Sequence, residues 1–364
     1  PRDCHTSSGR VGLWAVRGRV PRARSVAQVD SLRTRAAMLV RAYHTTPRSE
    51  LSADCLPFPT RVLVPASNLA TLNPLCSCET YRRPVLLPSG RHVVGYSVAG
   101  VLSPPENRKK GYALLMMRLL ALELRAPAGE ARVEWIDGQG PWTGGNDALL
   151  CVLYSDVGKF YQPAGWEIVG TARTTTWALD ALASPPSTSD STSPPRKLFP
   201  IPFDNSMLAA LASADVALLS TSLPSNSFAM DPNGATYHWH MTRSIFTATR
   251  SNISVPSTWG FRSTTSSAFV LFAFDFPHKE LKILRIRTTG GEEAREMMAR
   301  VFEEAIRAGC ERVVAWNLEA ELLGAMPDGQ RGTTAERDDS LSALNWFGEE
   351  GQGIWAYNEG YGWC

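Results

Sequence analysis

Long apolar runs, a dominant charge and a cysteine framework are all missing from this chain of 364 residues. No apolar stretch approaches the roughly 20 residues that a membrane-spanning helix needs, so we expect no membrane partner. The formal net charge is only +2. That near balance argues against a nucleic-acid partner, because phosphate binding usually requires a concentrated basic surface. What remains is a chain of ordinary apolar content that is long enough for two domains.

Cysteine is scarce, odd in number and scattered, with seven residues along the chain. This usage favours a reducing compartment over a disulfide framework, so we expect a cytoplasmic location. Cys76 and Cys78 have no second Cys/His pair nearby at zinc spacing. His238 and His240 could share one face of a strand, but a third ligand is lacking and a packing role is favoured. We therefore expect no metal cofactor.

The first 50 residues are poor in acidic residues and contain no lysine. They hold ten arginines against Asp3, Asp30 and Glu50. An Arg-rich, acid-poor start resembles a mitochondrial transit segment, which makes a mitochondrial location the alternative. A disordered tail or a poorly defined chain start explains the composition more simply, and we favour these explanations. Residues 1–55 are accordingly set apart as an atypical N-terminal segment.

The most informative feature present is a basic turn between an apolar strand and a helix. The pattern predicts a strand over His92–Leu102 and a helix over Gly111–Leu124, with Arg108, Lys109 and Lys110 between them. A helix N-terminus presents unpaired N–H groups and a partial positive charge, so it is a ready anion site. Basic residues there are unfavourable for the helix itself, which is easier to understand if an anion binds. A solvated basic turn is the simpler alternative.

The remaining pattern predicts an α/β layer arrangement over residues 56–183. In chain order the expected elements are strands Thr60–Pro65 and Leu75–Leu87, the strand and helix above, strand Leu149–Tyr154, a short helix or turn Asp156–Ala164, and strand Trp166–Leu179. Residues 184–196 are rich in Ser and Pro and predict a flexible linker.

Residues 197–364 predict a second, smaller α/β domain. Asp204–Leu219 is expected to be a helix with Asp204 as its N-cap. Further on we expect strands Ala268–Phe276 and Leu281–Arg287, helix Glu292–Ala308 and strand Arg312–Trp316. The order strand, strand, helix, strand is compatible with a degenerate repeat of the first domain.

Two motifs resemble those of the GNAT superfamily of N-acetyltransferases. Arg108–Ala113 matches Arg-x-x-Gly-x-Ala, the loop that binds the acyl-CoA pyrophosphate, and Phe160–Trp166 is similar to the Phe-Tyr-x-x-x-Gly-aromatic element after the fifth strand. More narrowly, stretches along roughly residues 60–364 resemble the fungal lysine N-acetyltransferase type. They are Cys78–Pro84, Ser103–Ala113, Leu153–Tyr161, Val314–Asn317, Arg337–Leu341 and Asn358–Cys364.

The resemblance implies a GNAT fold, a mixed central sheet flanked by helices, with acetyl-CoA as the acyl donor and a small primary amine as acceptor. Lysine or a lysine-like molecule is the expected amine. The residues implied to hold acetyl-CoA are Leu102, Ser103, Arg108, Lys109, Lys110, Gly111, Tyr112 and Ala113. The alternatives are another amine (a polyamine, a secondary metabolite or a protein lysine) or a non-catalytic CoA-binding or scaffold protein, which the atypical N-terminus motivates. The sequence does not specify the oligomeric state.

The resemblance also implies that Tyr161 is the general acid that protonates the departing CoA thiolate. A phenol with a reference pKa of about 10 is protonated at neutral pH and can donate. The alternative is that the Tyr161 ring simply packs beside Phe160 and Trp166.

The proton acceptor for the amine is less defined. Asp156 and Glu79 are candidates, although Asp156 could cap the turn that follows it and Glu79 could pair with a neighbouring arginine. By analogy with tandem GNAT enzymes, the carboxylate of Cys364 is a further candidate. The alternative for this aromatic tail is to close the domain interface, and a nucleophilic Cys364 thiol is disfavoured because GNAT transfer is direct.

Overall fold

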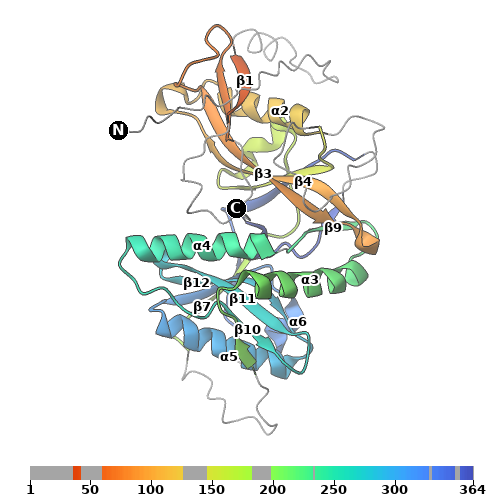
Figure 1. Cartoon of the computed structure of the whole chain (residues 1–364), viewed down its shortest axis with the longest axis vertical. Coiled ribbons are helices and arrows are strands. Elements are labelled where there is room, and N and C mark those ends of the chain that lie inside the picture. The colour runs from red at the N-terminus through yellow and green to blue at the C-terminus, as the bar shows by residue number, and fades with distance from the viewer. Residues whose placement is uncertain are drawn as a thin grey trace, which may run out of the picture.

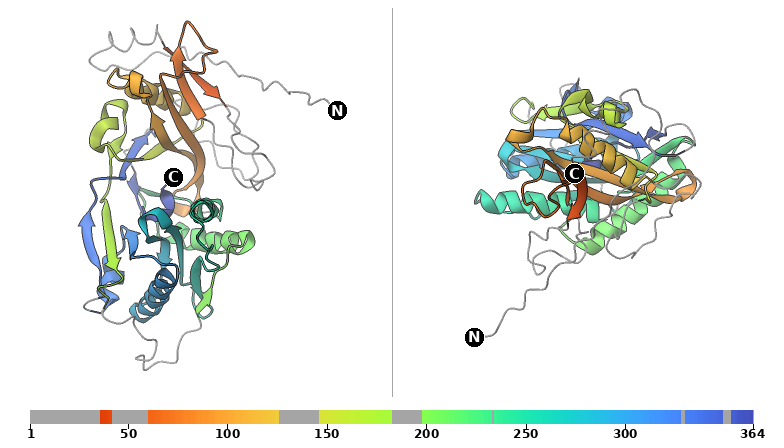
Figure 2. Two further views of the ribbon diagram at one scale, coloured as in Figure 1. Left: turned by 90° about the vertical axis from the view of Figure 1, so that its left-hand side faces the viewer. Right: turned by 90° about the horizontal axis from the view of Figure 1, so that it is seen from above.

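The chain folds around two β-sheets with helices packed on their faces (Figures 1 and 2). The structure is a computed structural model and describes residues 36–41, 60–125, 146–182, 198–232, 234–327, 330–348 and 353–363. Figure 1 shows α2 on one face of the first sheet, α3 and α4 between the two sheets, and α5 and α6 on the far side of the second. The predicted α/β fold class is confirmed.

The first sheet is antiparallel except where β4 meets β5 and where its short strands β9 and β16 pair. Its strands, in spatial order, are β1 (Ala36–Arg41), β2 (Thr60–Pro65), β3 (Cys76–Leu86), β4 (His92–Leu102), β5 (Leu150–Ser155), β15 (Leu341–Trp346) and β6 (Glu167–Ile168). Two short strands extend it from β3, namely β9 (Ser227–Met230) and β16 (Ile354–Trp355). The helix α2 (Tyr112–Leu124) crosses from β4 to β5 and buries Leu115, Met116 and Leu120 on the sheet.

The second sheet runs in the order β14 (Thr333–Glu336), β7 (Arg173–Ala178), β13 (Arg312–Trp316), β12 (Glu280–Arg287), β11 (Phe269–Asp275), β10 (Gly260–Ser263) and β8 (Leu198–Pro200). Its helices are α3 (Asn205–Ser222), α4 (Gly234–Arg250), α5 (Gly291–Arg307) and α6 (Ala320–Ala325). Asp204 caps α3 as predicted, because its carboxylate accepts the Met207 N–H at 2.7 Å.

The chain passes back and forth between the two sheets, so each sheet contains a strand from the part of the chain that mainly builds the other. β7 pairs with β13 and β14 of the second sheet, whereas β15 comes late in the chain and inserts between β5 and β6 of the first. The predicted single strand Trp166–Leu179 is therefore wrong: Gly170, with φ +68°, lies between β6 and β7, which join different sheets. The predicted linker, residues 184–196, lies outside the described residues, and the division into 56–183 and 197–364 stays a prediction.

The predicted strand geometry of His238 and His240 is also wrong, because both lie on α4. Tyr237, Met241 and Ala248 recur at helical spacing and are buried in the core, which explains the helix. The His240 ring packs against the tail, with Nε2 3.2 Å from the Tyr361 carbonyl oxygen. Within the described residues, no helix is long and apolar enough to cross a membrane, and no group of three or more His, Cys, Asp or Glu could hold a metal.

Candidate active site

The parallel strands β4 and β5 part from each other near their carboxyl ends. They pair only over Gly95–Val98 and Leu150–Leu153. Directly beyond, the register of β4 against β3 shifts by one residue at Gly100, a β-bulge in which Gly100 has φ +57°. The last residues of β4 therefore lie outside the ladder with β5. Backbone groups on that side of β4 are positioned to pair with a bound chain of amides.

The loop after β4 delivers basic side chains and open N–H groups to the same end of the sheet. Leu102 is 56% exposed at the strand end, and the Arg108 guanidinium bends back to the Ser103 carbonyl oxygen at 3.3 Å. Lys109 and Gly111 both have positive φ, 61° and 81°, which turns the chain sharply into α2. Only glycine adopts the second of these at little cost.

The first turn of α2 is left uncapped. Gly111 is its N-cap, and no side chain among the described residues caps it. Arg108, Lys109, Lys110 and Gly111 are exposed, while Tyr112 and Ala113 are half-buried against the core under the helix. Open N–H groups at a helix start, flanked by three cations, form an anion site of the kind that a pyrophosphate fits. The predicted acetyl-CoA residues thus lie together at the end of β4 and the start of α2; their role in binding stays a prediction.

Tyr161 lies on a 3-10 helix, η3 (Gly158–Ala164), that packs between α2 and the end of β5. Burial, with lesser contributions from Cys76 and Asp156, raises the pKa of Tyr161 to about 12. Cys76 in turn contacts the Ser103 side chain at the end of β4. Tyr161 is therefore a protonated phenol beside the opening between β4 and β5. The packing alternative also has support, since its ring meets Phe160 edge to face, with centroids 5.0 Å apart.

Asp156 has a structural partner far away in the sequence. Its exposed carboxylate accepts the Ser340 N–H at 3.0 Å and lies 3.2 Å from the Ser340 hydroxyl, at the turn that leads into β15. The turn after β5 is held instead by Ser155, whose hydroxyl donates to the Gly158 carbonyl at 2.7 Å. Asp156 thus fastens the exchanged strand β15 to β5, and its role as a base stays a prediction.

The C-terminal tail lies against the sheet on the face opposite α2. Cys364 is outside the described residues, but the tail is anchored up to Trp363. The Gly362 carbonyl accepts the Arg83 guanidinium of β3 at 2.8 Å, and Tyr154 of β5 donates to the Asn358 side chain at 3.0 Å. The Trp363 ring packs against Trp239 of α4 in a tilted arrangement, with centroids 5.9 Å apart.

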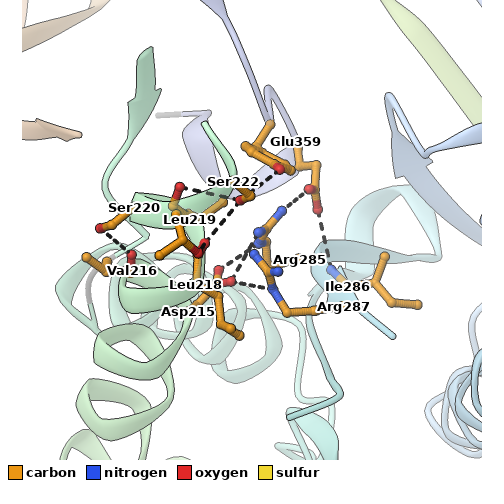
Figure 3. A network of polar contacts seen from close by, with 12 residues as sticks. Asp215, Val216, Leu218, Leu219, Ser220, Ser222, Arg285, Ile286, Arg287 and Glu359 are labelled. Carbon is orange, nitrogen blue, oxygen red and sulfur yellow. Dashed lines mark hydrogen bonds and ion pairs between the residues drawn. The ribbon is translucent and has the colours of Figure 1, made fainter. Parts of the chain in front are cut away.

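A buried charge network fixes the same tail to the second sheet. Figure 3 shows Glu359 pointing to Arg285 of β12, with Asp215 of α3 on the other side of the guanidinium. Arg287 also pairs with Asp215, at 2.6 Å. Composition and spacing gave no sign of this network. The only local signal was a run of aromatic residues at the end of the chain, which indicated an anchored tail.

Glu79, the second candidate base, lies on β3 next to the β4 bulge. Its carboxylate accepts the Tyr81 hydroxyl at 2.8 Å. The neighbouring arginines have other acids and acceptors: Arg82 binds Asp147 at 2.9 Å, and Arg83 binds the tail. Sequence spacing could not separate these arrangements, because both arginines follow Glu79 within four residues.

Known proteins match this chain in sequence, first of all over its second half. The family model described as the LYC1 GNAT-like C-terminal domain matches residues 182–364, half of the chain. A protein of Yarrowia lipolytica named lysine acetyltransferase is 24% identical over 278 residues, which cover 68% of this chain and 70% of that protein.

Two solved structures show a similar layout. A GCN5-related N-acetyltransferase from Kribbella flavida (TM-score 0.49, 13% identity) matches 78% of this chain, which spans only 59% of that protein. Eis1 from Mycobacterium abscessus (TM-score 0.47, 12% identity) matches 85% of this chain, and the match covers 74% of the Eis1 chain. Because both TM-scores are below 0.5, the description of the site rests on the contacts above and not on these structures. By the match of its second half, the chain belongs to the family described as LYC1 GNAT-like.

Proposed function

We propose that this protein is an N-acetyltransferase that moves an acetyl group from acetyl-CoA to a primary amine, with free lysine as the first acceptor. The observation that carries the proposal is the parting of β4 and β5 beside the open, basic start of α2. The family match supports acetyl transfer of the GNAT type, and the name of the Yarrowia relative supports lysine as acceptor.

In this proposal the loop after β4 binds the pyrophosphate, and the freed edge of β4 pairs with the pantetheine amides. A backbone N–H at that edge would polarise the thioester carbonyl as charge develops on its oxygen. The amine nitrogen attacks the carbonyl carbon, the C–N bond forms, and collapse of the tetrahedral intermediate breaks the C–S bond. Tyr161 gives its proton to the thiolate.

The reaction needs two proton transfers, so the site must contain an acid for the thiolate and a base for the ammonium. The Tyr161 phenol, with its pKa of about 12, remains protonated throughout the neutral range and can act as the acid. The acceptor is the harder partner, since a lysine ε-ammonium with a pKa near 10.4 costs about 4–5 kcal/mol to neutralise at pH 7. A carboxylate near the thioester would reduce that cost.

The direct test measures thiol release from acetyl-CoA with free lysine, a polyamine and a lysine peptide as separate acceptors. We expect lysine to be turned over at sub-millimolar concentration. Stabilisation by acetyl-CoA without thiol release from any amine would contradict transfer and favour a CoA-binding protein.

Tyr161→Phe tests the general acid. We expect a loss of about 100-fold or more in kcat with unchanged acetyl-CoA affinity, because the phenyl ring keeps the packing and loses only the proton. Tyr357→Phe is the matched control: its hydroxyl contacts Ser222 on the surface, away from the opening. Equal kcat for Tyr161→Phe and the wild type across the pH range would disprove the assignment.

A further inference from the structure

A single carboxylate on β3 lies beside the point where β4 leaves β5. Glu79 pairs in register with Ala99, the residue directly before the bulge. A Cβ atom built on Gly100 would lie 3.7 Å from the Glu79 carboxyl carbon. The carboxylate therefore covers the bulge itself, the place where the thioester would emerge from between the strands.

Strand alternation puts this carboxylate on the opposite face from the general acid. Cys76 and Cys78 are fully buried under α2, in the core that Tyr161 also contacts. Because side chains alternate along a strand, Glu79 and Tyr81 point away from α2. The general acid, which protonates the leaving thiolate, and the attacking amine would thus lie on different sides of the sheet.

The partner of Glu79 holds it in place without cancelling its charge. Tyr81 donates a neutral hydrogen bond to Oε2 at 2.8 Å. Among the described residues no ion pair involves Glu79, and its side chain is only half-buried, so a cation can reach it. Further along the same face, Arg83 ties down the tail through Gly362. The face therefore offers one oriented, uncompensated carboxylate for an incoming cation.

We propose that Glu79 binds the ammonium group of the acceptor and accepts its first proton; this inference rests on the proposed function. The ammonium gives one proton to Glu79 and becomes the nucleophile. As the tetrahedral intermediate collapses, the nitrogen loses a second proton, the C–S bond breaks, and the thiolate takes the Tyr161 proton. The second proton restores Tyr161 and Glu79 releases the first to solvent. The net products are the amide, the CoA thiol and one proton.

The experiment compares lysine with norleucine, which has the same carbon chain and lacks the ε-ammonium. Calorimetry measures the binding of each to the full chain saturated with CoA, in wild type and Glu79→Gln. We expect lysine to bind Glu79→Gln at least tenfold more weakly while norleucine binds both equally. In turnover assays kcat/KM for lysine falls about 100-fold in the variant, with CoA affinity unchanged. Tyr81→Phe gives a smaller loss in the same direction.

Glu336→Gln is the matched control, because this exposed carboxylate on β14 lies in the other sheet and its removal should change nothing. Equal lysine binding in wild type and Glu79→Gln overturns the inference. So does an equal loss for lysine and norleucine, which would indicate a structural role, or an absence of lysine binding to the wild type. If the wild type binds acetyl-CoA and lysine but releases no thiol, the proposed function fails, and the lysine–norleucine contrast still decides the role of Glu79.

Discussion

Two helices occupy the same place in their sheets, and their first turns are built in opposite ways. α2 links β4 to the parallel strand β5, and α5 links β12 to the parallel strand β13. α2 begins at an exposed glycine after three cations and has no cap. α5 also has a glycine N-cap and no side-chain cap, but its first turn carries Glu292 and Glu293, and Glu293 is fully buried.

The Glu293 carboxylate brings a negative charge of the chain itself to the start of α5. It accepts the Thr289 N–H at 2.9 Å, the Thr289 hydroxyl at 2.7 Å and the Ser266 hydroxyl at 2.5 Å. The helix dipole favours this negative charge as it would favour a phosphate. The comparison teaches that the chain layout alone does not make an anion site. The first turn must also be free of the chain's own negative charge, as it is in α2 and is not in α5.

An acidic residue in the first turn of α2, as in α5, should have the largest effect on this comparison. Leu114 is the third helical residue of α2, as Glu293 is of α5. We expect Leu114→Glu to weaken acetyl-CoA binding by about 100-fold or more, because the new carboxylate competes for the open N–H groups and repels the pyrophosphate. Leu114→Gln is the control with nearly the same shape and no charge. Isothermal titration with both variants measures the difference, and equal affinities would place the CoA phosphates elsewhere.

Removing the buried acidic side chain from the first turn of α5 is the reverse test. Glu293→Ala leaves the Thr289 N–H and two hydroxyls without their buried acceptor, so we expect the free energy of unfolding to fall by about 2–3 kcal/mol. Glu292→Ala, at a less buried position one residue earlier, should cost under about 1 kcal/mol. Urea unfolding of both variants provides the measurement. Similar losses for the two would show that Glu293 acts through the helix dipole alone.

The second sheet also neutralises charge internally around Glu359, and this gives a pH test (Figure 3). Burial raises the pKa of Glu359 from 4.5 to about 7, against the opposing effect of Arg285. Between these values the folded state holds a proton that the unfolded state has released, so this contribution to stability falls as the pH rises from about 5 to 8. We expect the wild type to lose about 1–2 kcal/mol relative to Glu359→Gln over that range. A constant difference between the two unfolding free energies would rule out the raised pKa.

The smallest effects should come from the cations of the loop. Arg108, Lys109 and Lys110 are exposed, so single substitutions to alanine should weaken acetyl-CoA binding only about two- to fivefold. The losses should shrink at high salt, because exposed charges are screened. Lys279→Ala, in the turn that leads into β12, serves as the control. A loss independent of salt would mean that these side chains act by packing and not by charge.

The sequence was most informative where a feature is contained in one continuous segment. The strand, basic loop and helix around Gly111 could be predicted because every relevant residue lies within a few positions of the next. Strand exchange could not, since β5 and β15 carry patterns that would suit either sheet. The Thr-rich stretch after Trp166 concealed a break whose only sign is Gly170. The Asp156–Ser340 contact joins residues far apart in the chain, and no local pattern encodes it.

The insertion of β15 between β5 and β6 also sets an order of events during protein synthesis. A ribosome would release β5 long before it makes Leu341–Trp346, so the edge of β5 must wait, unpaired, while nearly all of the second sheet emerges. An exposed strand edge during that interval invites pairing with other nascent chains. Slow translation or premature termination before residue 341 should therefore favour aggregation. Fragments that end near Leu182 should be recovered as insoluble material and not as an independent acetyl-CoA-binding unit.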